Sequence, residues 1–137
     1  MAGVTRFDRS AITGAVLVVD LAIIAAQLSY GLVLHGTDPL SVPIHTAETL
    51  FPFLLAWLLL APMLGVYTAR VRRSMTETVL AVTIAWIAAA LLGVGLRATP
   101  WLTGGAPLTF ILVTIGTGLL TLLPWRLLVS ALARNNN

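Results

Sequence analysis

The stretch GAVLVVDLAIIAAQ, residues 14–27, places a single carboxylate, that of Asp20, inside a long apolar run. The apolar run extends from 11 to 34, and a helix of about this length crosses the roughly 30 Å of hydrocarbon in a bilayer. A charged side chain at mid-bilayer costs at least about 2.5–3.5 kcal/mol, so that of Asp20 should face other helices. The stretch therefore predicts a membrane-spanning helix with a polar interior face.

The composition extends this prediction to the whole chain. Of the 137 residues, 58% are hydrophobic and 9% are charged, whereas about a quarter of the residues in soluble domains are charged. The net charge is +3, but the eight basic residues stand in short groups without a continuous basic face, which argues against nucleic acid as a partner. Because the chain has no cysteine, disulfides, thiolate nucleophiles and cysteine-ligated metals are excluded.

Four apolar segments are each close to the length of a membrane span, at 11–34, 49–67, 78–97 and 107–128. They should be helices, because an isolated strand would leave backbone groups unpaired in lipid and the alternation of a barrel strand is absent. The sequence therefore predicts an all-α integral-membrane four-helix bundle that forms a single domain over residues 1–137. Ser74 and Glu77 fit a capping box at the start of the third helix.

The arginines predict the orientation of the bundle. With four alternating helices, seven of the eight arginines fall on one side, and only Arg97 falls on the other. Basic residues are enriched in cytoplasmic loops. We therefore expect a multi-pass protein of the cytoplasmic (plasma) membrane with both termini in the cytoplasm.

Polar residues form one stripe on the first helix, since Thr13, Asp20 and Gln27 recur at seven-residue intervals. The candidate intramembrane polar site comprises Asp20, Gln27, Thr114, Thr117 and Thr121, with the three threonines supplied by the fourth helix. Arg126, at the inner rim, is a further possible partner of Asp20, but we expect its long side chain to snorkel outward to the membrane surface.

Asp20 has two interpretations. It could be a proton- or cation-binding carboxylate, because intramembrane acids commonly mark transport pathways. It could instead form a structural hydrogen bond or ion pair that fixes helix packing. The absence of a second mid-membrane acid argues against a proton relay and favours the structural interpretation.

At the outer rim, Arg97 closes the third helix and Glu48 begins the second. We expect these residues to form an ion pair, which would be either a stabilising rim contact or part of an anion or headgroup site. His35 and His45 flank the intervening outer loop, but their spacing matches no metal-ligand motif, so we predict no metal site. The chain also lacks the common nucleotide-binding and hydrolase motifs, so we predict no catalytic residues, no enzyme activity and no cofactor.

Several short segments occur in an order that resembles a known family. His35 follows the Asp20 helix, and the later segments are PFLLAW (52–57), LGVGLR (92–97), PLTFILV (107–113) and PWR (124–126). Their order is similar to that in the small four-helix membrane family catalogued as domain of unknown function 3054, found in haloarchaea and actinobacteria. The resemblance implies the architecture and a cytoplasmic-membrane location, and it implies no activity.

The sequence favours a non-enzymatic structural or assembly subunit of a membrane complex. Its partners would be membrane lipid and either a second copy, as a homodimer, or another membrane protein. The alternative is a small dimeric proton- or cation-coupled transporter that uses Asp20. A lipid-handling enzyme is the weakest candidate, because the sequence offers no nucleophile or metal-ligand set.

Overall fold

The computed structural model describes residues 8–100 and 107–135, and every regular element in these ranges is a helix. The elements are α1 (Ala11–Leu34), α2 (Pro43–Met63), α3 (Ala69–Arg72), α4 (Met75–Arg97) and α5 (Leu108–Asn135). The four longer helices are each long and apolar enough to cross a membrane. The predicted all-α class and the four helices of membrane-spanning length and hydropathy are therefore confirmed.

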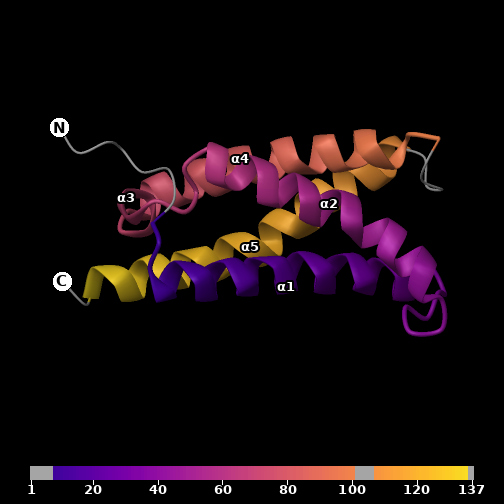
Figure 1. Ribbon diagram of the computed structural model, residues 1–137, viewed down its shortest axis with the longest axis horizontal. Coiled ribbons are helices and arrows are strands. Elements are labelled where there is room, and N and C mark those ends of the chain that lie inside the picture. The colour runs from indigo at the N-terminus through magenta and orange to yellow at the C-terminus, as the bar shows by residue number, and fades with distance from the viewer. Residues whose placement is uncertain (1–7, 101–106, 136–137) are drawn as a thin grey trace.

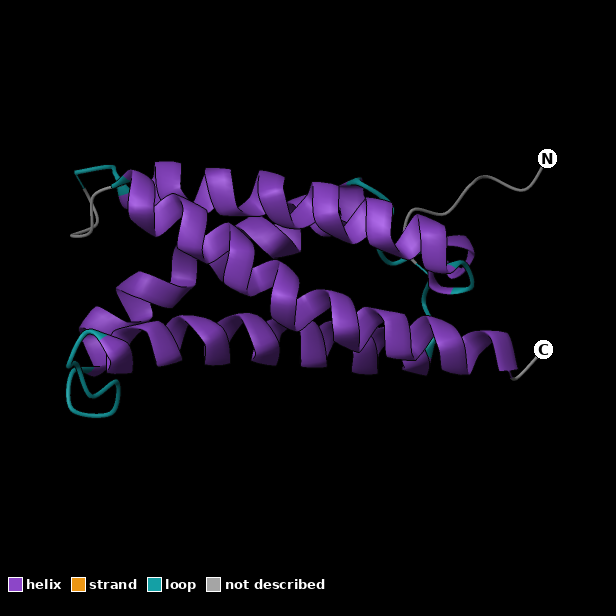
Figure 2. Cartoon of the chain, turned by 180° about the vertical axis from the view of Figure 1, so that it is seen from behind, coloured by secondary structure: helices purple, strands orange, loops and turns teal. Residues whose placement is uncertain are grey.

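The four long helices form a bundle in which each packs against two others (Figure 1). In order around the bundle the contacts are α1 with α2, α2 with α4, α4 with α5, and α5 with α1. The short helix α3 packs against α4 and α5, at the end of the bundle where α1 begins and α5 finishes. The view from behind in Figure 2 shows the same lengthwise arrangement and the loops at the two ends.

Three of the predicted segments differ from the helices in their bounds: the second helix ends at Met63 rather than 67, and the third spanning helix begins at Met75 rather than 78. The second helix begins at Pro43 rather than 49, since proline is well suited to the first helical position, where its missing N–H is not needed. The fourth spanning helix reaches Asn135 rather than 128, because the residues that follow 128 are mostly alanine, leucine and valine, which continue the helix. The first segment, 11–34, matches α1.

Side-chain caps set the starts of two of the four long helices. The Ser10 hydroxyl accepts a hydrogen bond from the backbone N–H of Thr13 at the start of α1. The Ser74 hydroxyl accepts one from the N–H of Glu77 at the start of α4, as the capping-box pattern predicts. The Glu77 carboxylate pairs with Arg70, with 3.2 Å between Nε and Oε2.

Two aromatic side chains pack against glycines where α4 contacts its neighbours. A Cβ atom at Gly118 of α5 would collide with the Trp86 indole of α4, and one at Gly93 of α4 would collide with the Phe53 ring of α2. The indole N–H of Trp86 donates to the carbonyl of Thr114, at 3.2 Å. Glycine at these two positions allows the helices to approach closely, as small residues commonly do between membrane helices.

Large apolar side chains also cover the outside of the bundle. Examples on α1 and α5 are Val18, which is 65% exposed, and Leu120, which is 76% exposed. In water, an apolar surface of this extent would be unfavourable. Lipid chains would cover it in a membrane, in agreement with the hydropathy of the four long helices.

Candidate functional site

Asp20 is completely buried, at the middle of the interior face of α1. The buried residues of this helix follow the helical period, and they are Thr13, Val16, Asp20, Ile24 and Leu28. Because the carboxylate lies on this stripe, the same amphipathic geometry that buries Ile24 carries Asp20 into the bundle. The prediction that Asp20 faces other helices holds in the structure.

Arg126 of α5 is the countercharge of Asp20. Its Nη1 lies 2.8 Å from Asp20 Oδ2, and its Nη2 donates to the carbonyl of Val66 at 2.9 Å. The side chain is 2% exposed. An ion pair this deeply buried avoids the penalty that either charge would incur alone in a medium of low dielectric constant.

The expectation that Arg126 snorkels to the membrane surface is therefore wrong, and the cause is the length of α5. Arg126 lies nine residues before the last residue of α5, and Asp20 lies nine residues after the first residue of α1. At a rise of about 1.5 Å per residue, both side chains start about 13 Å from the same end of the bundle. The two charges are level with each other, so pairing requires no long reach.

Two aromatic donors complete the surroundings of the carboxylate. The Tyr67 hydroxyl donates to Asp20 Oδ2 at 2.6 Å, and the Trp125 indole N–H donates to Asp20 Oδ1 at 2.9 Å. The Tyr67 oxygen in turn accepts a hydrogen bond from Trp57 Nε1 at 2.7 Å. We call these five residues, Asp20, Trp57, Tyr67, Trp125 and Arg126, the Asp20 cluster.

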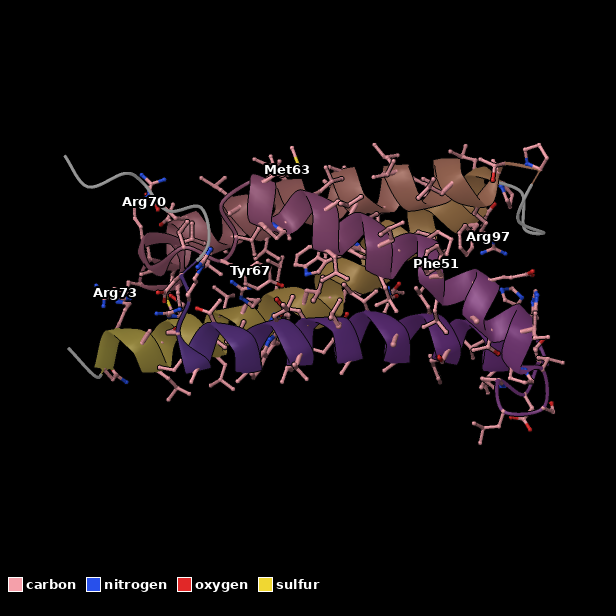
Figure 3. The ribbon with its side chains drawn as sticks, in the orientation of Figure 1. Phe51, Met63, Tyr67, Arg70, Arg73 and Arg97 are labelled. Carbon is pink, nitrogen blue, oxygen red and sulfur yellow. The ribbon has the colours of Figure 1, made fainter. Side chains whose placement is uncertain are left out.

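The position of Tyr67 depends on how α2 ends. Gly65 adopts a positive φ of 80°, the N–H of Val66 donates to the carbonyl of Ala61, and that of Gly65 donates to the carbonyl of Pro62. This is the Schellman arrangement, in which glycine takes the left-handed conformation and reverses the chain. The chain that follows turns inward, so that Val66 and Tyr67 are buried (Figure 3).

Burial raises the pKa of the Tyr67 hydroxyl, and the charge of Asp20 raises it further. The hydroxyl therefore keeps its proton throughout the physiological range and can act as a hydrogen-bond donor to the carboxylate. The Arg126 guanidinium also lies over the Tyr67 ring, with Cζ 5.4 Å from the centroid. Tyr67 thus contacts both members of the ion pair.

The other members of the predicted intramembrane site bond elsewhere. Thr117 donates to Gln27 Oε1 at 2.7 Å and so links α5 to α1. Thr121 donates to carbonyls of its own helix, and the Thr114 carbonyl accepts from Trp86. None of the hydrogen bonds among the described residues joins Gln27 or these threonines to Asp20, so the predicted site is divided into two separate contacts.

The predicted ion pair between Glu48 and Arg97 is not among the ion pairs of the described residues. Instead, the Arg97 guanidinium lies over the Phe110 ring of α5, with Cζ 4.3 Å from the centroid. Phe110 is the third residue of α5, and α4 and α5 are neighbours in the bundle. Its ring therefore occupies the position beside Arg97 in which the sequence analysis placed a carboxylate.

A second polar network lies at the end of the bundle near α3. The Arg72 guanidinium contacts the Asp8 carboxylate at 3.0 Å and donates to the Thr13 hydroxyl at 2.9 Å. The hydrogen bond from Arg72 is the main cause that lowers the pKa of Asp8, and a bond from Ser10 adds to it. This network ties the residues before α1 to α3, and the sequence analysis missed it.

Among the described residues, no group of three or more His, Asp, Glu or Cys side chains could hold a metal ion. His35, which the sequence places in the outer loop, is exposed. The chemistry that the described residues bring together is therefore the ion pair and the aromatic hydrogen-bond donors around Asp20.

The sequence analysis also missed Tyr67, Trp57 and Trp125 as partners in the site around Asp20. A usable signal was present for Tyr67, because Gly65 lies two residues before the predicted end of the second segment and glycine near a helix end commonly reverses the chain. For the two tryptophans, the sequence indicates only that a buried indole N–H requires a hydrogen-bond acceptor, without identifying that acceptor. Asp20 and the Tyr67 oxygen meet that need.

A bundle of four apolar helices around a buried ion pair defines a small helical-bundle membrane protein. The model of one family, described as a protein of unknown function (DUF3054), matches residues 17–129. The chain therefore belongs to the DUF3054 family, and the matched region contains the whole Asp20 cluster. No curated protein and no solved structure matches the chain.

Proposed function

We propose that this protein is a non-enzymatic, multi-pass protein of the plasma membrane that serves as a structural or assembly subunit. The Asp20 cluster is then an internal clamp that holds the bundle in one arrangement. The observation that carries the proposal is the set of donors around Asp20: two aromatic side chains and one guanidinium, from α5 and from the turn after α2.

The clamp joins segments that are far apart in the chain. Arg126 belongs to α5, and its Nη2 also holds the Val66 carbonyl just after α2. One ion pair thus connects α1, α5 and the turn between α2 and α3. Such a cluster favours one helix arrangement over others, because every alternative packing would separate a charge from its partner in a low-dielectric interior.

The same geometry argues against the alternative, a small dimeric proton- or cation-coupled transporter that uses Asp20. A coupling carboxylate must release its partner in order to take up a proton or a cation. Asp20 is paired with a guanidinium that stays charged at all physiological pH values, and it is completely buried. Exchange would require breaking the ion pair and the hydrogen bonds from Tyr67 and Trp125 in each cycle.

The low burial of the spanning helices supports an assembly role. Within the single chain, only 17% of the apolar window of α5 and 28% of that of α1 are buried. The remaining helix surface is available to lipid or to a partner in the membrane. The concentration of arginines at the α3 end supports a cytoplasmic location for that end and for both termini.

The decisive experiment compares Asp20→Asn with the wild-type protein, in two measurements. The structural proposal predicts a lower thermal unfolding midpoint in detergent. It also predicts that wild-type protein in proteoliposomes does not couple a pH gradient to uptake of the cationic dye ethidium. Asp38→Asn, in the loop between α1 and α2, is the matched control and should leave the midpoint unchanged.

The opposite pattern would overturn the proposal. If the wild-type protein concentrated ethidium at the expense of a pH gradient, and Asp20→Asn folded with an unchanged midpoint but lost that uptake, Asp20 would be a coupling carboxylate. Cross-linking in native membranes tests the assembly part separately. An assembly subunit should be trapped in a product larger than the monomer, and a protein that is trapped only as a monomer would contradict that role.

A further inference from the structure

Arg97 lies at the end of the bundle opposite Arg70 and Arg73 (Figure 3), and packing holds it in place. Its guanidinium rests on the Phe110 ring, with Cζ 4.3 Å from the centroid. The Phe110 ring contacts that of Phe53 edge to face, at 6.0 Å between centroids. Phe53 in turn packs against Gly93, one helical turn before Arg97.

These contacts fix the orientation of the guanidinium but do not supply a hydrogen-bond acceptor for all of its N–H groups. Nη1 of Arg97 is buried and donates no hydrogen bond to any residue that the structure describes. The aromatic ring covers one face of the planar group, and Arg97 as a whole is only half-buried, so part of its guanidinium stays accessible at the rim. A buried N–H without an acceptor is unfavourable, so an acceptor that approaches the accessible part of the guanidinium from outside the described chain would stabilise Arg97 in this position.

The acceptor that fits this geometry is an oxyanion. The five N–H donors of arginine form a rigid fork that matches the oxygens of a phosphate or a carboxylate. Phe110 belongs to the first turn of α5, and the N-terminal end of a helix adds partial positive charge. Among the described ion pairs none involves Arg97, so no carboxylate of that part of the chain neutralises it.

The depth of Arg97 in the bundle identifies the source of the oxyanion. Arg97 lies 22 residues after the first residue of α4, or about 33 Å along the helix axis. The hydrocarbon core of a bilayer is about 30 Å thick, so with α4 spanning it Arg97 is level with the headgroups. The oxyanions that are concentrated at this level are the phosphates of phospholipids.

We propose that Arg97, held on the Phe110 ring, forms a binding site for the phosphate of a phospholipid headgroup, at the bundle end opposite α3. The site is independent of the Asp20 cluster, because α4 and α5 carry it at the other end of the bundle. It would anchor one lipid to the rim at which the chain has a single arginine.

The experiment measures lipid-dependent stabilisation of the purified protein in detergent micelles. Phosphatidylglycerol, diacylglycerol with the same acyl chains, and inorganic phosphate are titrated separately, and the thermal unfolding midpoint is recorded. We expect phosphatidylglycerol to raise the midpoint and diacylglycerol, which lacks the phosphate, to have no effect. A rise with inorganic phosphate at equal concentration would support the phosphate site but assign it to free phosphate rather than lipid.

Three variants connect the response to the site. Arg97→Gln should weaken the apparent affinity for phosphatidylglycerol on the order of tenfold or more, and Arg97→Lys should retain part of it because the charge remains. Phe110→Leu, which keeps the arginine but removes its aromatic support, should also weaken it. The matched control Arg73→Gln, at the opposite end, should leave the Arg97-dependent response intact.

Two results would overturn the proposal. One is a wild-type midpoint that neither phosphatidylglycerol nor inorganic phosphate raises. The other is an Arg97→Gln variant that responds to phosphatidylglycerol as the wild type does. If Arg97→Gln fails to fold, Arg97→Lys and Phe110→Leu replace it. The proposal is then overturned if both variants respond to phosphatidylglycerol as the wild type does.

Discussion

Arg126 Nη1 lies 2.8 Å from Asp20 Oδ2, although the two residues are 106 positions apart in the chain. Both side chains are almost completely buried, with exposures of 2% for Arg126 and 0% for Asp20. The pair joins the first and the last spanning helix. Its contribution to stability can be measured directly, because each partner can be replaced by an uncharged polar residue.

The first prediction concerns this ion pair. Asp20→Asn and Arg126→Gln should each lower the free energy of unfolding by about 3–5 kcal/mol, because each leaves one buried charge without its countercharge. The double variant should lose clearly less than the two single losses added together. Unfolding by sodium dodecyl sulfate, followed by tryptophan fluorescence, measures all three values.

Arg134→Gln is the control for this cycle, since Arg134 is an exposed arginine on the same helix. Its effect should stay within about 0.5 kcal/mol. If the losses of the two single variants simply added in the double variant, the two charges would not be coupled, and the clamp would be refuted.

The second prediction concerns the Tyr67 hydroxyl. Tyr67→Phe keeps the ring but removes the donor to Asp20 and the acceptor for Trp57, so it should destabilise the protein by about 1–3 kcal/mol. Tyr30→Phe removes a hydroxyl from a residue that is 62% exposed, and it should have little effect. Equal unfolding midpoints for the two variants would show that the Tyr67 hydroxyl adds nothing to the cluster.

The third prediction uses two glycines of α5 that differ only in their surroundings. Gly118→Ala forces a Cβ atom into the Trp86 indole and should destabilise the bundle by about 1–3 kcal/mol. Gly116→Ala meets nothing within 4 Å and should be neutral or stabilising by up to about 1 kcal/mol, because alanine favours the helix. The order of the two unfolding midpoints tests the packing of α4 on α5, and the reverse order would contradict it.

The fourth prediction is a pH dependence at the α3 end of the bundle. The hydrogen bond from Arg72 lowers the pKa of Asp8 below its ordinary value of 3.8. A lowered carboxylate pKa contributes stability that is complete above the unfolded-state value and is lost as the pH falls through the folded-state value. As the pH falls from about 5 through the ordinary pKa of an aspartate, the unfolding midpoint should therefore fall more steeply for the wild type than for Asp8→Asn.

The partner side of the network can be tested in the same pH series. Arg72→Gln removes the main cause of the shift, so its midpoint should follow the shallower curve of Asp8→Asn. Arg73→Gln, at an exposed neighbouring position, should follow the wild type. If the unfolding midpoints of the wild type and Asp8→Asn changed in parallel with pH, the Asp8 carboxylate would not contribute to stability in this way.

Individual residues show which parts of the site could be predicted from the sequence. The interior orientation of Asp20 followed from the cost of a charge in lipid, which is a local argument about a single helix. The burial of Arg126 did not follow, because it depended on the continuation of α5 to Asn135. The predicted segment ended at 128 although mostly apolar residues continue the helix beyond it, so the arginine was placed too close to the membrane surface.

The partner of Arg97 illustrates a similar limit. The sequence contains one acid, Glu48, at the predicted outer rim near the start of the second helix, and opposite charges suggested an ion pair. In the structure α5 presents Phe110 to Arg97 instead. Which neighbour reaches a side chain at a helix end depends on how the helices are arranged around the bundle, and hydropathy carries no information on that order.

The sequence by itself determined the class of the protein, the number of spanning helices and the interior face of α1. These features follow from hydropathy, helix length and the period of 3.6 residues, which act within about twenty consecutive residues. Only the tertiary structure decided the identity of the groups around Asp20: Tyr67 is 47 positions away, and Trp125 and Arg126 are 105 and 106 positions away. The physical reason is that a buried charge requires a partner but does not specify one, and the choice is made by the depth and direction from which the other helices present their polar groups.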